Sequence, residues 1–287
     1  MIPAFLNQAA GSAVAAGEAL AADPRFALHS LVPSTLPHAV KAEIKRGTRR
    51  ILVAGGDGTV AAAASEAVGR PVQLAILPGG TLNHFAKDYG IPLDPREALE
   101  VSAGTANRRV DVGFVNDRLF LNTSSVGAYV SFVHRRDRLE PHLGYRLGSL
   151  VAALRIMARL RSYRIELQIE GKIRRYRTPL VFIGVDERDL RLPIFGSRMD
   201  NGQSGLHAIV VRGKTRARIM AIALAAAARG IRAVSRTPHL DSFLVNHCRI
   251  DLPREWSYVG LDGETVPLRT PLRYRIVRRA LTLVVPR

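Results

Sequence analysis

The sequence predicts an α/β fold, with an N-terminal domain built on a parallel sheet and a second, β-rich and sandwich-like domain after it. Residues 1–110 alternate short apolar runs with helical patterns, which is typical of parallel strands covered by helices. Beyond residue 110 the pattern changes to short strands joined by turns. The chain has 287 residues, and a single hydrophobic core usually stops growing near this length, so two domains are expected.

Two buried strands and two helices are the clearest elements of the first half. The strands are predicted at residues 51–54 and 72–77, because both are unbroken apolar runs. The helices are predicted at residues 59–68 and 81–89. Each begins at a threonine whose hydroxyl can cap the first amides, and each is followed by a glycine that stops it. Residues 1–6 are expected to form the first strand.

The second half is predicted to consist mainly of strands. They are expected at residues 110–115, 119–123, 163–169, 173–176, 180–185 and 206–211, with a hairpin turn at Glu170-Gly171 and a strand pair within 273–286. Two helices, at 144–161 and 215–234, carry arginines on their polar faces. The predicted domains are therefore 1–110, rejoined by the C-terminal segment 275–287, and 111–274.

The composition indicates a folded chain with an anionic partner. The formal net charge is +18, from 42 Lys and Arg against 24 Asp and Glu. Nucleic acid, anionic lipid headgroups and phosphorylated small molecules all fit this charge, and so does an Arg-rich surface without such a role. Cys248 is the single cysteine, so no internal disulfide is expected, and the histidines show no zinc spacing. The longest apolar run, at 219–228, is half of the roughly 20 residues that a membrane-spanning helix needs.

A glycine-rich loop, Gly55-Gly56-Asp57-Gly58-Thr59, lies between a predicted buried strand and a predicted helix. In parallel sheets, ligands bind beyond the carboxyl ends of the strands, where helix N-termini offer unpaired amides and a partial positive charge. Glycines there let the backbone approach phosphate oxygens closely. A loop that only cradles phosphate gains nothing from a carboxylate, so Asp57 is expected to hold a magnesium ion or a nucleotide hydroxyl. The alternative is a simple tight turn.

A second glycine pair lies in the segment Leu77-Pro78-Gly79-Gly80-Thr81-Leu82-Asn83, at the end of the next predicted strand. Right-handed crossovers keep the ends of successive parallel strands at one edge of a sheet, so both loops are expected to face one crevice. Two such loops, each opening a helix, predict a phosphate-rich ligand. The Walker pattern and a spaced G-x-G-x-x-G are both absent, which excludes a P-loop and a dinucleotide fingerprint.

These residues resemble the catalytic domain shared by diacylglycerol kinases, bacterial lipid kinases and sphingosine kinases. Besides the two glycine loops, Asn7 and Gly11-Ser12 are similar to the family's opening Asn-Pro-x-Ser-Gly loop, and Gly260-Leu261-Asp262-Gly263-Glu264 is similar to its late Asp-Gly-Glu motif. The first glycine loop also occurs in NAD kinases and phosphofructokinases. The Leu-Pro-Gly-Gly-Thr-x-Asn segment narrows the resemblance to lipid kinases.

The resemblance implies that ATP and Mg²⁺ bind at the two loops and that a lipid such as diacylglycerol is phosphorylated. It implies that Glu264, as the catalytic base, accepts the proton of the lipid hydroxyl, with Asp57 as a second catalytic residue. The implied nucleotide-binding residues are Asn7, Gly55, Gly56, Asp57, Gly58, Thr59, Gly79, Gly80, Thr81 and Asn83. The expected location is cytoplasmic, with the chain bound peripherally to an anionic membrane at its inner face, because no signal peptide is evident. The oligomeric state stays open, with a homodimer as one option.

The chain also departs from the family pattern. Gln8 replaces a proline in the opening loop, and Ser204-Gly205-Leu206-His207-Ala208 stands where the family has an acidic Asp-Gly-x-x-Asp segment. A hard cation prefers carboxylate ligands, so the family's secondary magnesium site is not expected, and Asp200 is the nearest substitute. No residue is therefore nominated as a protein ligand of a metal at this secondary site.

Three other functions compete with this interpretation. An NAD kinase-like enzyme would share the first glycine loop, and its test is phosphorylation of NAD without any effect of lipid. A nucleotide-binding regulator without activity would fit the missing acidic pair, and would bind ATP without phosphoryl transfer. A nucleic-acid module fits the net charge, but the aromatic residues are scattered without a stacking pattern, so nucleic acid is not expected as a partner.

Overall fold

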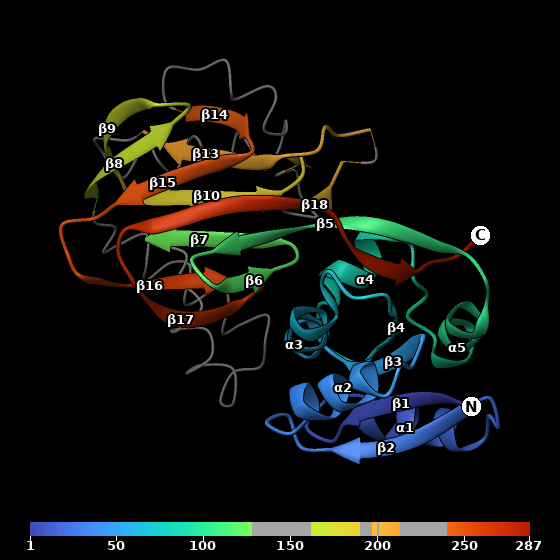
Figure 1. Ribbon diagram of the computed structural model, residues 1–287. Coiled ribbons are helices and arrows are strands. Elements are labelled where there is room, and N and C mark those ends of the chain that lie inside the picture. The colour runs from blue at the N-terminus through green and yellow to red at the C-terminus, as the bar shows by residue number, and fades with distance from the viewer. Residues whose placement is uncertain (128–161, 190–196, 200, 213–239) are drawn as a thin grey trace. The chain divides into compact units, whose positions relative to one another are not determined.

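The computed structural model of the chain describes residues 1–127, 162–189, 197–199, 201–212 and 240–287 (Figure 1). The chain divides into two compact units. Unit 1 is Met1–Val112 with Val277–Arg287, and unit 2 is Gly113–Ile276. The strands β5 (Asn107–Val115) and β18 (Leu272–Val284) each pass from one unit to the other.

Unit 1 is built on a parallel sheet with the strand order β2-β1-β3-β4-β18. Its first four strands are β1 (Ile2–Asn7), β2 (Phe26–Leu31), β3 (Arg50–Gly55) and β4 (Gln73–Pro78). Every neighbouring pair is parallel, including β4 with the C-terminal end of β18. Five of the six residues are buried in both β3 and β4, as continuous apolar runs predict for a sheet covered on both faces. The predicted parallel sheet is thus confirmed.

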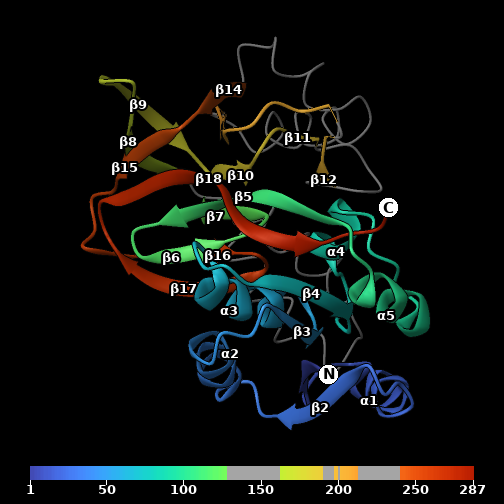
Figure 2. The same cartoon turned by 45° about the vertical axis from the view of Figure 1, so that its right-hand side comes forward.

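The helices of unit 1 are α1 (Ala13–Ala21), α2 (Leu36–Lys45), α3 (Asp57–Ala67), α4 (His84–Asp88) and α5 (Pro95–Ala103). Helix α2 packs beside α3, as Figures 1 and 2 both show, and α1 packs beside α5. The buried stripe of α3 is Val60, Ala63, Ala64 and Ala67, at the spacing of one helix face. Among the described helices, none combines the length and the apolarity needed to cross a bilayer.

Unit 2 contains two sheets around one hydrophobic core. The first sheet contains parts of β5 and β18 with β6 (Arg118–Phe120), β15 (His247–Asp251), β8 (Tyr163–Ile169) and β9 (Lys172–Thr178). The second, wholly antiparallel sheet has the order β14 (Leu240–Val245), β13 (Leu206–Val211), β10 (Leu180–Val185), β7 (Thr123–Gly127), β16 (Trp256–Leu261) and β17 (Glu264–Arg269). A two-stranded ribbon pairs β11 (Arg188–Asp189) with β12 (Ser197–Arg198). Buried side chains from both large sheets form one cluster, in agreement with the predicted β-rich, sandwich-like architecture.

Several sequence-based strand boundaries are correct, and two predictions of strands in the second half are wrong. The predicted strands at 163–169, 180–185 and 206–211 match β8, β10 and β13, and Glu170-Gly171 forms the predicted hairpin turn with φ values of 48° and 76°. The predicted strand at 119–123 is instead two strands, β6 and β7. The predicted strand pair at 273–286 is a single strand, because β18 continues through Arg279, whose φ is 51°. The predicted helices at 144–161 and 215–234 lie outside the described residues.

Candidate functional site

The candidate site lies at the carboxyl ends of β1, β3 and β4 in unit 1. Strand β2 flanks β1 on one side and β3 flanks it on the other, so the chain changes direction across the sheet between β1 and β3. Crevices at such switch points, beyond the carboxyl ends of the strands, are the usual ligand sites of open α/β sheets. The loops after β1, β3 and β4 all carry residues that the sequence nominates.

The two glycine loops contact each other through their backbones. Strands β3 and β4 pair in register up to Gly55 and Pro78, and the amide of Gly79 donates a hydrogen bond of 2.9 Å to the carbonyl of Gly55. A Cβ atom added to Gly80 would lie 2.6 Å from the Cα of Gly56, and one added to Gly79 would lie 3.2 Å from the Cα of Gly55. Glycine is therefore required here by the close approach of the loops. This contact agrees with the prediction that both loops face one crevice.

Replacing Gly80 with alanine is expected to lower the free energy of unfolding by about 1–3 kcal/mol, because the methyl group would lie 2.6 Å from the backbone Cα of Gly56 and 3.0 Å from the Oδ1 of Asn83. Gly11→Ala is the matched control in the neighbouring loop. Its methyl group would meet nothing nearer than 4.0 Å, so its stability should be unchanged or raised by up to about 1 kcal/mol. Chemical denaturation measures both. Equal stability of the two variants would contradict this account of the loops.

The loop after β1 is tied to both glycine loops. The Nδ2 of Asn7 donates a hydrogen bond of 2.8 Å to the Oγ1 of Thr59, and the Oδ1 of Asn7 accepts one from the amide of Ala9 at 2.9 Å. The amide of Ser12 donates to the carbonyl of Gly79 at 3.3 Å. The hydroxyl of Thr59 therefore does not cap helix α3, whose N-cap residue is Gly56, and that part of the prediction is wrong.

Asp57 connects the first glycine loop to the segment after the second. It is the first residue of α3, and its carboxylate accepts hydrogen bonds from the amides of His84 at 3.1 Å and Phe85 at 3.0 Å. Sequence reasoning missed this contact, which spans 27 residues of chain. Each carboxylate oxygen keeps a further lone pair, so these contacts leave acceptor capacity for a ligand.

Asn83 closes the second loop on itself. Its Oδ1 accepts from the amide of Gly80 at 2.8 Å, and its Nδ2 donates to the carbonyl of Gly80 at 2.7 Å. Asn83 adopts a left-handed conformation with φ 51°, which asparagine tolerates better than most residues. Thr81 thus lies in a turn, and helix α4 begins at His84. The helix predicted at 81–89 starts three residues too early, because the side chain of Asn83 competes for the backbone groups of Gly80.

Glu264 belongs to unit 2, where it is the exposed first residue of β17. It follows a two-residue turn in which Asp262 and Gly263 have φ values of 47° and 92°. The carboxylate of Asp262 accepts hydrogen bonds from three amides of the β6–β7 connection, those of Leu121, Asn122 and Thr123, at 2.7, 2.8 and 2.9 Å. Asp262 therefore fixes the turn that presents Glu264, a role that sequence reasoning did not assign. These amide contacts also explain why the predicted strand at 119–123 is interrupted.

The segment that replaces the family's acidic pair carries a histidine inside unit 2. The Nδ1 of His207 accepts from the amide of Arg188 at 3.0 Å, and its Nε2 lies 2.8 Å from the Oγ of Ser242. The neighbouring buried carboxylate, Asp186, forms an ion pair with Arg198. No cluster of three or more potential metal ligands occurs among the residues that the structure describes, and Asp200 lies outside them. Burial raises the pKa of the Cys248 thiol to about 12, so it is not a nucleophile at neutral pH.

Mg²⁺ in nucleotide sites is commonly held by one or two carboxylates together with phosphate oxygens. The glycine loops contribute one such carboxylate, that of Asp57, next to backbone surfaces without side chains. This donor set fits an ion carried in by a nucleotide, and it does not fit an ion held by protein groups alone.

Comparison with known proteins covers the part of the chain that contains these loops. Residues 5–115 match the diacylglycerol kinase catalytic domain. The match covers less than half of the 287-residue chain, so the similarity to this family applies to residues 5–115. The matched segment includes Asn7 and both glycine loops, whereas Glu264 lies outside it.

Relatives with curated names match part of the chain. A protein of Chromohalobacter salexigens named "Probable lipid kinase YegS-like" is 45% identical over 89 residues, which are 28% of this chain and 27% of that protein. A diacylglycerol kinase of Mycobacterium tuberculosis H37Rv is 29% identical over 141 residues, 47% of this chain and 45% of that one. The chain thus matches less than half the length of either relative.

A solved structure extends the similarity of the fold beyond residues 5–115. A diacylglycerol kinase from Bacillus anthracis aligns over 99% of this chain and 96% of that one, with a TM-score of 0.72 and 17% sequence identity. At this identity the alignment concerns the fold. It supports the prediction of a parallel-sheet α/β part with a separate antiparallel part.

Proposed function

We propose that the chain is an ATP-dependent lipid kinase that transfers the γ-phosphate of ATP to the hydroxyl group of diacylglycerol or a related lipid. The observation that carries the proposal is the close backbone contact of two glycine loops at one edge of the parallel sheet, within the segment that matches the diacylglycerol kinase catalytic domain. The relatives named above are a lipid kinase and a diacylglycerol kinase by name, and the proposal extends that activity to this chain.

In this proposal the loops bind the triphosphate and Glu264 acts on the acceptor. Phosphoryl transfer asks a protein mainly to position the reactants and to neutralise the phosphate oxygens. The amides of the glycine loops and the N-terminus of α3 would contact the phosphates, with Asp57, Asn7 and Asn83 holding the loops in place. A bound Mg²⁺ ion would supply positive charge next to the phosphate oxygens of ATP.

In the proposed transfer to the lipid, one bond forms and one bond breaks at the γ-phosphorus of ATP. The Glu264 carboxylate accepts the proton of the lipid hydroxyl as the hydroxyl oxygen bonds to the γ-phosphorus, and the bond from that phosphorus to the β–γ bridging oxygen breaks. ADP leaves with the bridging oxygen. The lipid acceptor implies an anionic membrane as partner and a peripheral position at the inner, cytoplasmic face. These assignments are part of the proposal.

The test is incubation of the full chain with ATP labelled at the γ-phosphate, Mg²⁺ and a total lipid extract. A labelled lipid phosphate in the organic phase is expected. Labelled NADP formed from added NAD, with no labelled lipid, would replace the proposal by an NAD kinase-like activity. ATP binding without transfer to any lipid would indicate a nucleotide-binding regulator.

A further inference from the structure

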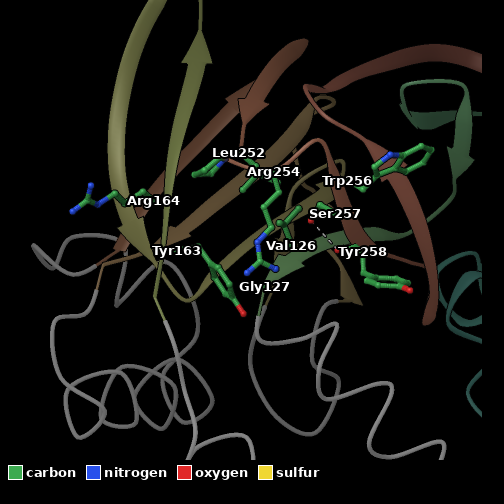
Figure 3. A pocket seen from close by; sticks show the side chains of 10 residues that line it. Val126, Gly127, Tyr163, Arg164, Leu252, Arg254, Trp256, Ser257 and Tyr258 are labelled. Carbon is green, nitrogen blue, oxygen red and sulfur yellow. Dashed lines mark hydrogen bonds between the residues drawn. The ribbon is translucent and has the colours of Figure 1, made fainter.

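A cavity of about 340 Å³ opens in unit 2 where the chain passes from one sheet to the other. Tyr163 and Arg164 line it from β8, and Figure 3 shows the side chain of Arg164 pointing away from that of Tyr163. Trp256 and Tyr258 line it from β16, and Arg254 lies in the connection from β15 to β16. We call these five residues the docking face. Figure 3 shows the ring of Tyr163 and the guanidinium of Arg254 pointing to the same side of the cavity, with Trp256 and Tyr258 extending from β16.

The aromatic rings of the docking face are unusually exposed. The exposed fractions are 39% for Tyr163, 52% for Trp256 and 58% for Tyr258. Within the described part of the chain, these three are the only aromatic side chains in the exposed class, and all three line the same cavity. Single exposed apolar residues are ordinary, whereas exposed rings gathered at one place indicate an interaction surface.

Arginines accompany the rings. Arg164 and Arg254 are exposed, and neither makes an ion pair with a described residue. A third arginine, Arg269, lies over the ring of Trp256 with its Cζ 5.3 Å from the ring centroid, but its charge is paired with Glu255 at 3.0 Å. Next to the docking face, a second cavity shares Arg164 with the first and adds Arg175 and Arg177. The carboxylates that line this second cavity are Glu166, which pairs with Arg175, and Asp251, which pairs with Arg249, so the surface keeps a net positive charge.

This combination of groups fits a bilayer surface. Trp and Tyr are enriched where membranes meet water, because an apolar ring with a polar edge suits that layer. Arginines near an anionic leaflet each add about a factor of five in affinity. The lining of the cavity also includes the apolar residues Val126, Leu252 and Pro253, which suit lipid chains better than nucleic-acid phosphates. We infer that the docking face binds the chain to a membrane of anionic phospholipid. The choice of a membrane as occupant rests on the proposed function.

The chain contains one tryptophan, so its fluorescence reports on the docking face without any substitution. The full chain is mixed with vesicles of phosphatidylcholine alone or with added phosphatidylglycerol. With phosphatidylglycerol, the emission of Trp256 should shift to shorter wavelength and be quenched by lipids that carry bromine on their acyl chains. High salt should reverse the effect. Co-sedimentation with anionic vesicles while this emission stays unchanged would overturn the inference, because another surface would then hold the membrane.

A charge variant tests the arginines separately. Arg164→Gln with Arg254→Gln should lower the apparent affinity for anionic vesicles about 30-fold at low salt, from two lost cations. The matched control is Arg70→Gln with Arg96→Gln, two exposed arginines of unit 1, which should change the affinity less than about twofold. Circular dichroism checks that both variants fold. Equal losses in the two variants would mean a general charge effect and would overturn the assignment to the docking face.

The vesicle measurements contain no ATP and are therefore independent of catalysis. If the chain phosphorylates detergent-dispersed diacylglycerol but does not bind vesicles, the inference about the docking face is wrong and the proposed function stands. If the chain binds vesicles through Trp256 but phosphorylates no lipid, the proposed function is wrong and the inference about the docking face stands. If the chain binds a short DNA duplex but does not bind anionic vesicles, the docking face is assigned to nucleic acid and the inference is overturned.

Discussion

The Asp57→Ala variant is expected to lose phosphoryl transfer by about 100-fold or more. The Asp57 carboxylate accepts the amides of His84 and Phe85, so alanine removes the acceptor that joins the start of α3 to the segment after the second glycine loop. Displacing a positioned group by about 1 Å can cost about 100-fold in rate, and the variant also lacks the proposed magnesium ligand. The rate with γ-labelled ATP and diacylglycerol measures the loss. Near-normal activity would remove Asp57 from the proposed site.

A matched control separates loss of a helix cap from loss of function. Asp94 also accepts two backbone amides, those of Arg96 and Glu97, at the start of α5, and it lies outside the glycine loops. Losing a cap of this kind costs about 1 kcal/mol of stability. Asp94→Ala should therefore lower the melting temperature by a similar amount to Asp57→Ala while keeping its activity. Equal loss of activity in both variants would mean that the effect of Asp57→Ala is merely one of stability.

Asp57→Asn distinguishes the charge of Asp57 from its hydrogen bonds. The amide keeps one acceptor oxygen for the amides of His84 or Phe85 but carries no negative charge. If Asp57 only holds the loops together, Asp57→Asn should recover much of the activity that Asp57→Ala loses. If its charge also holds the ion, the asparagine variant should stay inactive, and raising the Mg²⁺ concentration should restore part of the rate.

The sequence predicts the strands and loops that have strong local signals. Residues 51–54 and 72–77 are continuous apolar runs, so their strands are recognisable without any knowledge of partners. The glycine loops follow directly, since a strand, two glycines and a helix in that order place a loop at the sheet edge. The close contact of Gly56 with Gly80 agrees with the expectation that both loops face one crevice.

The side-chain contacts that organise the loops are not predictable in this way. Asn7 and Thr59 are 52 residues apart, and their hydrogen bond depends on the parallel pairing of β1 with β3. The local pattern suggested that the Thr59 hydroxyl caps a helix, and the tertiary contact with Asn7 took precedence. Asp57 shows the same limit, because its partners His84 and Phe85 follow β4, 27 and 28 residues later in the chain.

Strands β14 to β17 show why part of unit 2 was missed. Segment 240–269 has strands with mixed burial, such as β16, whose first three residues are not buried and whose last three are. Such strands lack a regular alternation of buried and exposed residues. Their pairing partners therefore decide where they form. The turn before Glu264 depends on Asp262, whose three amide partners lie about 140 residues earlier in the chain. No local pattern reveals such a contact.

The Glu264→Gln variant is expected to lower turnover about 100-fold or more while leaving the affinity for ATP unchanged. Glutamine has the same size and keeps the start of β17 paired with Leu261, but it cannot accept a proton from the lipid hydroxyl. The affinity should persist because the proposed ATP contacts come from the glycine loops of unit 1. Turnover with diacylglycerol and the dissociation constant for ATP, measured by calorimetry, are the two readouts.

Glu170→Gln is the control for this prediction. Glu170 is another exposed carboxylate of unit 2, in the turn between β8 and β9, and like Asp262 it precedes a glycine with positive φ. Its replacement should change neither turnover nor ATP affinity. If Glu264→Gln behaves like this control, the proton acceptor is another group. If instead Glu264→Gln weakens ATP binding as much as it slows turnover, then Glu264 acts on the nucleotide. Only a loss confined to turnover supports the base, because proton acceptance matters after both substrates are bound.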